Sequence, residues 1–441
     1  MGELRASAGK VDLRPQAGQW MTGYGGRVDP AEGTHDPIMA RAVALDDGSN
    51  RLVVVACDLL GFSPAYVETV RKRVRQKIGL PEHSLLIACT HTHSGPASMP
   101  MRGQMGMVDN KWLRTTQMLL VNLICDLIKD LEPARLAWGT TRVPGIGFNR
   151  QDSTRDVDTE LVALTVERPD GSTIATIVNY ATHAVVLGPQ NLLFSGDFPG
   201  AVARQLDEMT GGVGLYLQGA CGDVDPVTQI QKGWGRGTFQ DCEDIGKRLA
   251  HAAIESFNNK PRISTVAVNS RRRNVQLPLD PAPSLSEIDV LIDQFKREKK
   301  EAAAGSKPDR VREWTSKAML EWARALRLKL LSDCVPTHLD VEVYVARINE
   351  LRMVGLPFET YTDIGLGIKQ GVKSKLGRDV PVMFVGYANG LYGYCPTTWA
   401  KEQGGYGADV SCRWFEALLT PIGRGADDVL IGEGASLASE L

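Results

Sequence analysis

Two histidines lie two residues apart in the run Thr-His-Thr-His-Ser-Gly-Pro at residues 90–96. If this segment continues an extended strand, His91 and His93 point to the same side, because alternate residues of a strand share a face. Two converging imidazoles suit metal binding or proton transfer. Histidine pairs are also common on protein surfaces, so the flanking residues decide. A buried strand predicted at 85–89 and a turn at 94–96 favour a site.

Four further side chains that can do chemistry follow short apolar runs elsewhere: His183, Asp225, Glu359 and Tyr394. Each has an ordinary interpretation. A lone histidine among apolar residues is more often a hydrogen-bonded core residue, and a carboxylate at a helix start is favoured by the helix dipole. An acidic turn and a tyrosine-rich loop are equally common without any activity. Their joint occurrence after predicted strands is what indicates one shared site.

The elements that would position these residues are short runs rich in β-branched residues, each ending in polar residues and often followed by a helical pattern. This alternation predicts an α/β fold, a layered mixed sheet flanked by helices. Ligands of such folds lie at the carboxyl ends of strands. Because the polar clusters run from Asp58 to beyond Tyr394, dividing the chain would split the site. We therefore expect a single catalytic domain over residues 1–441.

Residues 283–333 differ from this pattern and predict an inserted helical hairpin. Apolar residues recur there at helical spacing, at Ile288, Leu291, Ile292 and Phe295, and again at Trp314, Ala318, Trp322 and Leu326. The ordinary interpretation is a solvated pair of helices packed on the body. The alternative is a lid or a contact within a homo-oligomer, because two tryptophans are unfavourable to leave exposed.

Composition excludes several classes of protein. The 50 Lys and Arg against 52 Asp and Glu argue against a general nucleic-acid binder, which carries a basic excess. No apolar run approaches the roughly 20 residues that span a bilayer, so no transmembrane segment is expected. The eight cysteines are scattered, which favours buried thiols and a reducing, cytoplasmic location. A chain of 441 residues buries enough surface without a metal, so a metal here would be functional.

The sequence resembles the neutral ceramidase family, the neutral/alkaline non-lysosomal ceramidases, in order from about Gly23 to Tyr406. The run at 90–96 is similar to the family's most recognisable motif. The Ala-Thr-His at 181–183, the Pro-Phe-Glu-Thr at 357–360 and the segment 389–394 resemble three others. The resemblance implies one zinc ion per chain, with four ligands: His91, His183, Glu359 and, as a phenolate, Tyr394.

The resemblance also implies roles for neighbouring residues. His93 would contact the scissile amide, Arg150 would bind the substrate carbonyl, and Tyr406 would help to bind the oxyanion. His35 keeps step with a family histidine, and we place it with Asp197 and Asn389 among the substrate-binding candidates. The residues alone leave the general base open among His93, Asp197 and Asp225.

One departure from the family bears on the substrate. The family has a serine where this chain has Asp225, in the run Gly-Asp-Val-Asp-Pro at 222–226. We expect hydrolysis of an amide bond in a small or lipid-like substrate, and we count Asp225 among the catalytic candidates. One alternative keeps the metal site but cleaves an ester, lactone or glycosidic bond, because an added carboxylate can serve acid/base chemistry at another leaving group. A second alternative is a non-catalytic binding protein, against which the intact set of four ligands argues.

Overall fold

The computed structural model describes residues 2–304 and 306–441, and within them most strands belong to three sheets. The first sheet has the order β6-β5-β4-β2-β7. Its strands are β2 (Arg5–Asp12), β4 (Met39–Asp46), β5 (Arg51–Cys57), β6 (Leu85–Cys89) and β7 (Glu132–Pro133). Helix α1 (Pro64–Ile78) connects the parallel strands β5 and β6, and α2 (Asn110–Lys129) packs beside it.

The second and third sheets repeat this arrangement. The second has the order β13-β11-β10-β8, with β8 (Arg135–Arg142), β10 (Glu160–Glu167), β11 (Thr173–Tyr180), β13 (Val213–Gln218) and the helices α3 (Asp197–Thr210) and α5 (Phe239–Phe257). The third has the order β16-β17-β18-β20, with β16 (Val268–Pro278), β17 (His338–Ile348), β18 (Leu351–Gly355), β20 (Val382–Val385) and the helices α8 (Thr362–Leu376) and α10 (Ala426–Ser439). In each, one helix joins a parallel pair, β11 to β13 and β18 to β20. The predicted α/β fold is therefore confirmed, with its strands divided among three sheets.

Short elements complete the described chain. Two-residue and three-residue ladders pair β1 (Gly2–Glu3) with β15 (Thr265–Val266), β3 (Gly33–Thr34) with β12 (Leu193–Phe194), β9 (Gly147–Asn149) with β14 (Val224–Pro226), and β19 (Glu359–Thr360) with β21 (Tyr394–Cys395). The short helices are η1 (Glu82–Ser84), η2 (Gly103–Gly106), α4 (Thr228–Gln231), α9 (Thr398–Gln403), η3 (Tyr406–Val410) and η4 (Ser411–Arg413).

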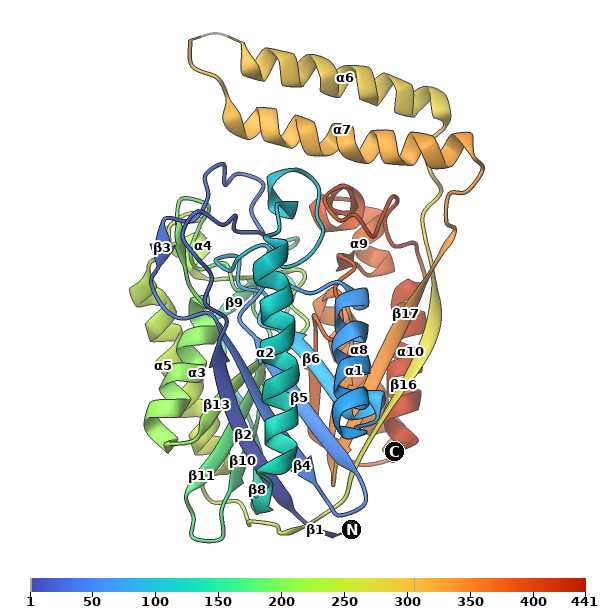
Figure 1. Cartoon of the computed structure of the whole chain (residues 1–441). Coiled ribbons are helices and arrows are strands. Elements are labelled where there is room, and N and C mark those ends of the chain that lie inside the picture. Colours follow the sequence, from blue (N-terminus) through green and yellow to red (C-terminus); the bar gives the residue numbers. More distant parts are fainter. Residues whose placement is uncertain (1, 305) are drawn as a thin grey trace.

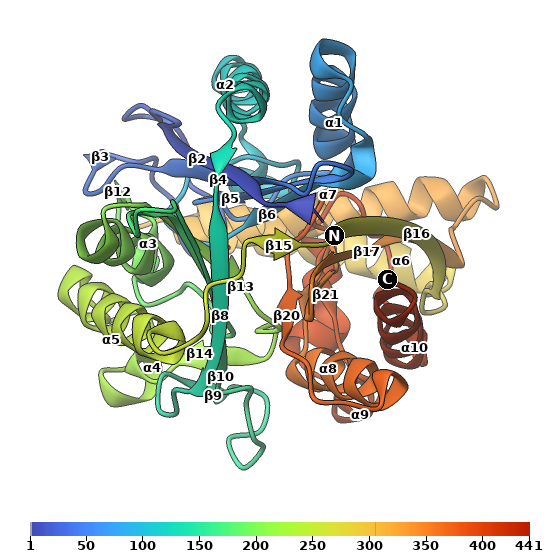
Figure 2. The same ribbon diagram turned by 90° about the horizontal axis from the view of Figure 1, so that it is seen from below.

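The three sheets surround a common apolar core. Alternate residues of β5 separate the two faces: Val54 belongs to the shared cluster, whereas Val53 and Val55 pack beneath α1 and α2. The shared cluster also contains Leu164 of the second sheet and Met353 of the third. Figure 2 shows the sheets meeting around this centre, with a pair of helices outside each. Burial on both faces explains the nearly continuous apolar runs of the sequence. The assignment of residues 1–441 to one domain stays a prediction, which this shared core supports.

The predicted insertion is present as the hairpin of α6 (Leu285–Ala303) and α7 (Arg310–Leu331), which lies across one end of the molecule (Figure 1). Its inner face joins the core of the first sheet. Trp322 is buried, and its Nε1 donates to the Leu419 carbonyl at 2.8 Å. The ring of Trp314 lies 5.8 Å from that of Trp20. Both tryptophans therefore contact the body, and a lid or oligomer role stays a prediction. Among the described helices, none combines the length and apolar character that a bilayer crossing requires.

Candidate active site

The side chains of His91 and His183 are fixed by hydrogen bonds to backbone carbonyls. His91 lies two residues beyond β6 with φ 64, a left-handed conformation that is unfavourable for a residue other than glycine. Its Nδ1 lies 2.8 Å from the Leu60 carbonyl, and Nδ1 of His183 lies 2.8 Å from the Cys221 carbonyl. A carbonyl only accepts, so each Nδ1 carries the proton and each Nε2 presents a lone pair.

Glu359 lies where these two lone pairs converge. Its Oε2 is 3.1 Å from His91 Nε2 and 3.2 Å from His183 Nε2. These separations resemble ion pairs, yet none of the three buried atoms has a hydrogen-bond partner. The Nε2 atoms have no proton to give, because the protons are on Nδ1. Three buried acceptors facing one point are unfavourable unless a cation lies among them.

A β-ladder of only two residue pairs places Tyr394 beside Glu359. Strands β19 and β21 are parallel, and Glu359 is the register partner of Tyr394. The Tyr394 hydroxyl accepts a 2.8 Å hydrogen bond from Arg150 Nη2. Burial raises the pKa of this phenol well above its ordinary value, although Arg150 acts in the opposite direction. Conversion to a phenolate ligand would therefore need the charge of a metal ion.

His93 lies beside this set with its ring nearly perpendicular to that of His91, at 4.8 Å between centroids. Ligand nitrogens of His91, His93 and His183 all lie within 4.8 Å of one another, a grouping that could hold a metal. The contacts of Glu359 with His91 and His183 are shorter, so Glu359 lies between these two rings and His93 lies beside them. Burial, followed by His91 and His183, lowers the pKa of His93 well below its ordinary value. His93 is therefore neutral at pH 7.

Gly23 leaves the space that His93 occupies. It has φ 106, and a Cβ built on it would lie 2.4 Å from Cδ2 of the His93 ring. The next residue, Tyr24, packs its ring 4.8 Å from that of His93. The position of the imidazole thus depends on the absence of a side chain at residue 23.

Arg150 and Asp225 meet because β9 pairs with β14. Asp225 Oδ1 lies 3.2 Å from Arg150 Nη1, and Arg150 Nη2 donates to the Gly222 carbonyl at 2.7 Å. Although burial lowers it, the pKa of Arg150 is held well above its ordinary value by Tyr394 and Asp225. The guanidinium is therefore a permanent cation beside the predicted ligands. Tyr406 is half exposed in the π-helical turn η3, with its ring edge-on to that of Tyr394 at 5.7 Å.

The structure does not bring His35 or Asp197 into this cluster. His35 Nδ1 lies 3.0 Å from Asp36 Oδ1, and its ring stacks on Phe239 at 3.6 Å. The oxygens of Asp197 accept the backbone N–H groups of Leu187 and Phe198 at 3.0 and 2.7 Å. Both side chains are occupied in holding neighbouring loops, and neither contacts His91 or His183.

Asn389 is likewise given a structural position. Its Oδ1 accepts the backbone N–H of Ile87 at 2.9 Å, and its Nδ2 donates to Glu342 Oε1 at 2.9 Å. Both ends of the amide are thus used to tie β6 to β17. The substrate contact expected of Asn389 stays a prediction.

Two side chains at the site escaped sequence reasoning. Tyr387 stacks its ring on His91 at 4.0 Å, and its hydroxyl lies 3.1 Å from Cys221 Sγ. It lies two residues beyond β20, so the signal used for the other residues, a polar side chain after an apolar run, could have found it. Arg27 is buried and donates from Nη1 to the His93 carbonyl at 2.7 Å. Burial lowers the pKa of Arg27 to about 10. Nothing in its sequence context distinguishes it from a surface arginine.

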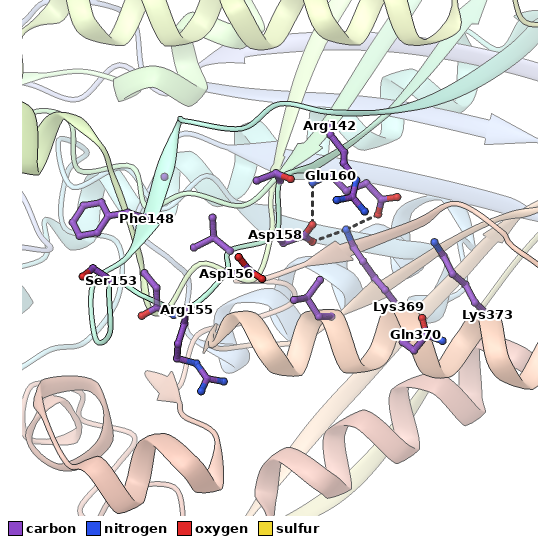
Figure 3. Close-up of a pocket in the computed structure, with 15 residues that line it drawn as sticks. Arg142, Phe148, Ser153, Arg155, Asp156, Asp158, Glu160, Lys369, Gln370 and Lys373 are labelled. Carbon is purple, nitrogen blue, oxygen red and sulfur yellow. Dashed lines mark hydrogen bonds and ion pairs between the residues drawn. The ribbon is translucent and has the colours of Figure 1, made fainter.

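A cavity of about 620 Å³ lies apart from this cluster and shares no lining residue with it. It lies between the loop after β9 and helix α8, and most of the residues that line it are polar or charged (Figure 3). Within it the buried Lys369 contacts Asp158 Oδ2 at 2.6 Å and Glu160 Oε2 at 3.0 Å. This ion-pair group fastens the loop that carries Arg150 to the helix that follows Glu359.

Comparison with known proteins agrees with the geometry. The family model for "Neutral/alkaline non-lysosomal ceramidase, N-terminal" matches residues 6–280. The neutral ceramidase of Mycobacterium tuberculosis is 22% identical, over 98% of this chain and 78% of that protein. The neutral ceramidase of Pseudomonas aeruginosa is 22% identical, over 94% of this chain and 70% of that protein.

The fold is also similar to solved structures. The crystal structure of the Pseudomonas aeruginosa neutral ceramidase superimposes with a TM-score of 0.74 at 19% identity, covering 100% of this chain and 74% of that one. This likeness establishes the fold, and the sequence match establishes the kinship. The chain therefore belongs to the neutral/alkaline non-lysosomal ceramidase family, whose members are metal-dependent hydrolases acting on an amide bond.

Proposed function

We propose that this protein is a zinc-dependent hydrolase that cleaves an amide bond in a small or lipid-like substrate. The observation that carries the proposal is the convergence of His91 Nε2, His183 Nε2 and Glu359 Oε2 without hydrogen-bond partners. Tyr394, the register partner of Glu359, adds a fourth donor atom, its phenolic oxygen. Two imidazole nitrogens with carboxylate and phenolate oxygens form a donor set that suits Zn²⁺. We propose one ion per chain.

A bound zinc ion supplies a Lewis acid and lowers the pKa of its water to about 7. The chain's own residues would do the remaining work. Arg150, held by Asp225 and Gly222, directs its charge toward the place where a substrate carbonyl would become negative. Loss of one such donor commonly slows a reaction about 100- to 1000-fold. Half-exposed Tyr406 lies at the outer side of Tyr394, where a substrate would pass.

His93 is the side chain that best fits proton transfer. Its Nδ1 lies 3.2 Å from the His91 carbonyl, which leaves Nε2 free of the proton. Because the imidazole is neutral, Nε2 could take a proton and later give it to the leaving amine nitrogen. Asp197 fits this role poorly, since both of its oxygens accept backbone N–H groups. Asp225 lies close enough to Arg150 to remain a second candidate.

Elemental analysis of the purified chain tests the metal. We expect about one zinc per chain, lost in His91→Ala and retained in His35→Ala, a matched histidine outside the cluster. Chelation should abolish hydrolysis while the far-ultraviolet spectrum persists, because a core of this size does not depend on a metal. Matched amides, esters, lactones and glycosides then identify the bond. Active protein without any metal would contradict the proposal, and cleavage of the esters, lactones or glycosides alone would favour the alternative that Asp225 motivates.

A further inference from the structure

Asp225 presents a negative charge that its protein neighbours use only in part. Its side chain is 7% exposed, and Oδ1 lies 3.2 Å from Arg150 Nη1. Among the described residues, none donates a hydrogen bond to Oδ2. Oδ2 is not among the fully enclosed side-chain atoms that lack a partner, so it is open to solvent on the side of the site. Oδ2 is thus an open acceptor within the site.

The neighbouring cation cannot satisfy Oδ2 in addition. Arg150 already gives Nη2 to the Gly222 carbonyl and to the Tyr394 hydroxyl, at 2.7 and 2.8 Å. Arg27, the other buried guanidinium nearby, donates to the carbonyls of His93, Asn191 and Gly188. The partner for Oδ2 therefore comes from outside the chain, as water or as a group of a bound ligand.

The chemistry of a carboxylate restricts that partner. A serine at this position could donate to or accept from a substrate hydroxyl, so a neutral polar group would not require the acidic residue. A carboxylate only accepts, repels other acceptors, and forms its strongest hydrogen bonds with cations. The side chain also balances the fixed charge of Arg150, so that the site tolerates a second cation.

We propose that Asp225 determines specificity and that the substrate carries an ammonium group beside the scissile amide, as in an N-acylated diamine. The inference rests on the proposed function, since it places the amide at His91, His183 and Glu359. Oδ1 orients Arg150 and Oδ2 accepts from the ammonium group. Substrates with an anionic group at that point are excluded.

Titration calorimetry with uncleavable probes tests this inference. The probes are octane-1-sulfonamides whose nitrogen carries a 2-aminoethyl, a 2-hydroxyethyl or a propyl group, so that a sulfonamide replaces the cleavable amide. They differ only in ending with ammonium, hydroxyl or methyl. With the zinc-supplemented full chain, we expect the ammonium probe to bind about 10- to 100-fold more tightly than the methyl probe. In Asp225→Asn and Asp225→Ser the ratio of the two affinities should fall below about threefold, because the ammonium probe loses more affinity than the methyl probe.

The exposed Asp156→Asn variant, which removes a carboxylate elsewhere, should keep the wild-type ratio. Equal binding of the three probes by the wild type, or no binding of the ammonium probe at millimolar concentration, would overturn the inference. So would an equal loss for all probes in Asp225→Asn, because Asp225 would then only orient Arg150. Failure of the proposed function appears separately, as protein that neither holds zinc nor cleaves amides, whereas the binding ratio needs no turnover.

Discussion

Replacement of Gly23 by alanine should slow catalysis without emptying the metal site. The added Cβ would lie 2.4 Å from Cδ2 of His93, whereas ordinary contacts begin at 3.4 Å. The imidazole, or the loop before it, must therefore move by about 1 Å. A misplacement of that size can reduce a rate about 100-fold. The ligands His91 and His183 do not contact Gly23, so zinc content should stay near that of the wild type.

The assay is kcat on a cleaved amide, with zinc content and melting temperature measured on the same samples. Alanine at φ 106 is also strained, by about 1–2 kcal/mol. Gly18→Ala is the matched control, since Gly18 has φ 90 but nothing within 4 Å of its built Cβ. Both variants should lose similar stability, and only Gly23→Ala should lose about two orders of magnitude in kcat. Equal kcat in the two variants would refute the dependence of His93 on the space at Gly23.

Three other changes have outcomes that the structure specifies. Tyr394→Phe should weaken zinc binding without emptying the site, because three of the proposed ligands remain. A competition titration with a chelator measures the zinc affinity, and an unchanged affinity would show that Tyr394 is not a ligand. Lys369→Met should reduce the free energy of unfolding by about 3–5 kcal/mol, because it leaves the buried carboxylates of Asp158 and Glu160 without their cation. Chemical denaturation measures this free energy. A loss below about 1 kcal/mol would contradict the prediction. Burial raises the pKa of Asp58 from 3.8 to about 6, so the folded state takes up a proton that the unfolded state does not bind between those values. Wild type should therefore gain up to about 3 kcal/mol relative to Asp58→Asn as pH falls from 7 to 4, and denaturation curves that move together with pH would contradict this.

Much of the site follows from short local patterns. The predicted strand at 85–89 is β6 as it stands in the structure, and its polar end does supply His91 and His93 to the site. The reason is physical: a strand buried on both faces gives an unbroken apolar run, and the first polar residue after it lies at the edge of the sheet. The same pattern also predicted Glu359, which lies four residues beyond the end of β18.

Other features depend on contacts that no local pattern records. The division into three sheets is hidden because their apolar runs have the same periodicity. The parallel pairing of Glu359 with Tyr394 joins residues far apart in sequence through a ladder two residues long. The same rule also selected Asn389, which follows a strand but uses both ends of its amide to join β6 to β17. A polar residue at a strand end can serve the fold or a ligand, and only its partners distinguish the two.

Because the three sheets follow one another along the chain, the parts of the site are synthesised one after another. His91 follows the first sheet's parallel pair and His183 follows β11 of the second sheet. Glu359 and Tyr394 lie in the β19–β21 ladder, whose strands follow β18 and β20 of the third sheet, beyond the α6–α7 hairpin. A nascent chain that has reached residue 280, the end of the family match, holds both histidines but neither oxygen ligand. Two imidazoles alone bind zinc weakly and reversibly compared with a complete set of four ligands. With the proposed ligands, capture of a metal would require the last sheet to have joined the other two. A ribosome-stalled series of chains ending before and after Tyr394 should then differ sharply in zinc retention.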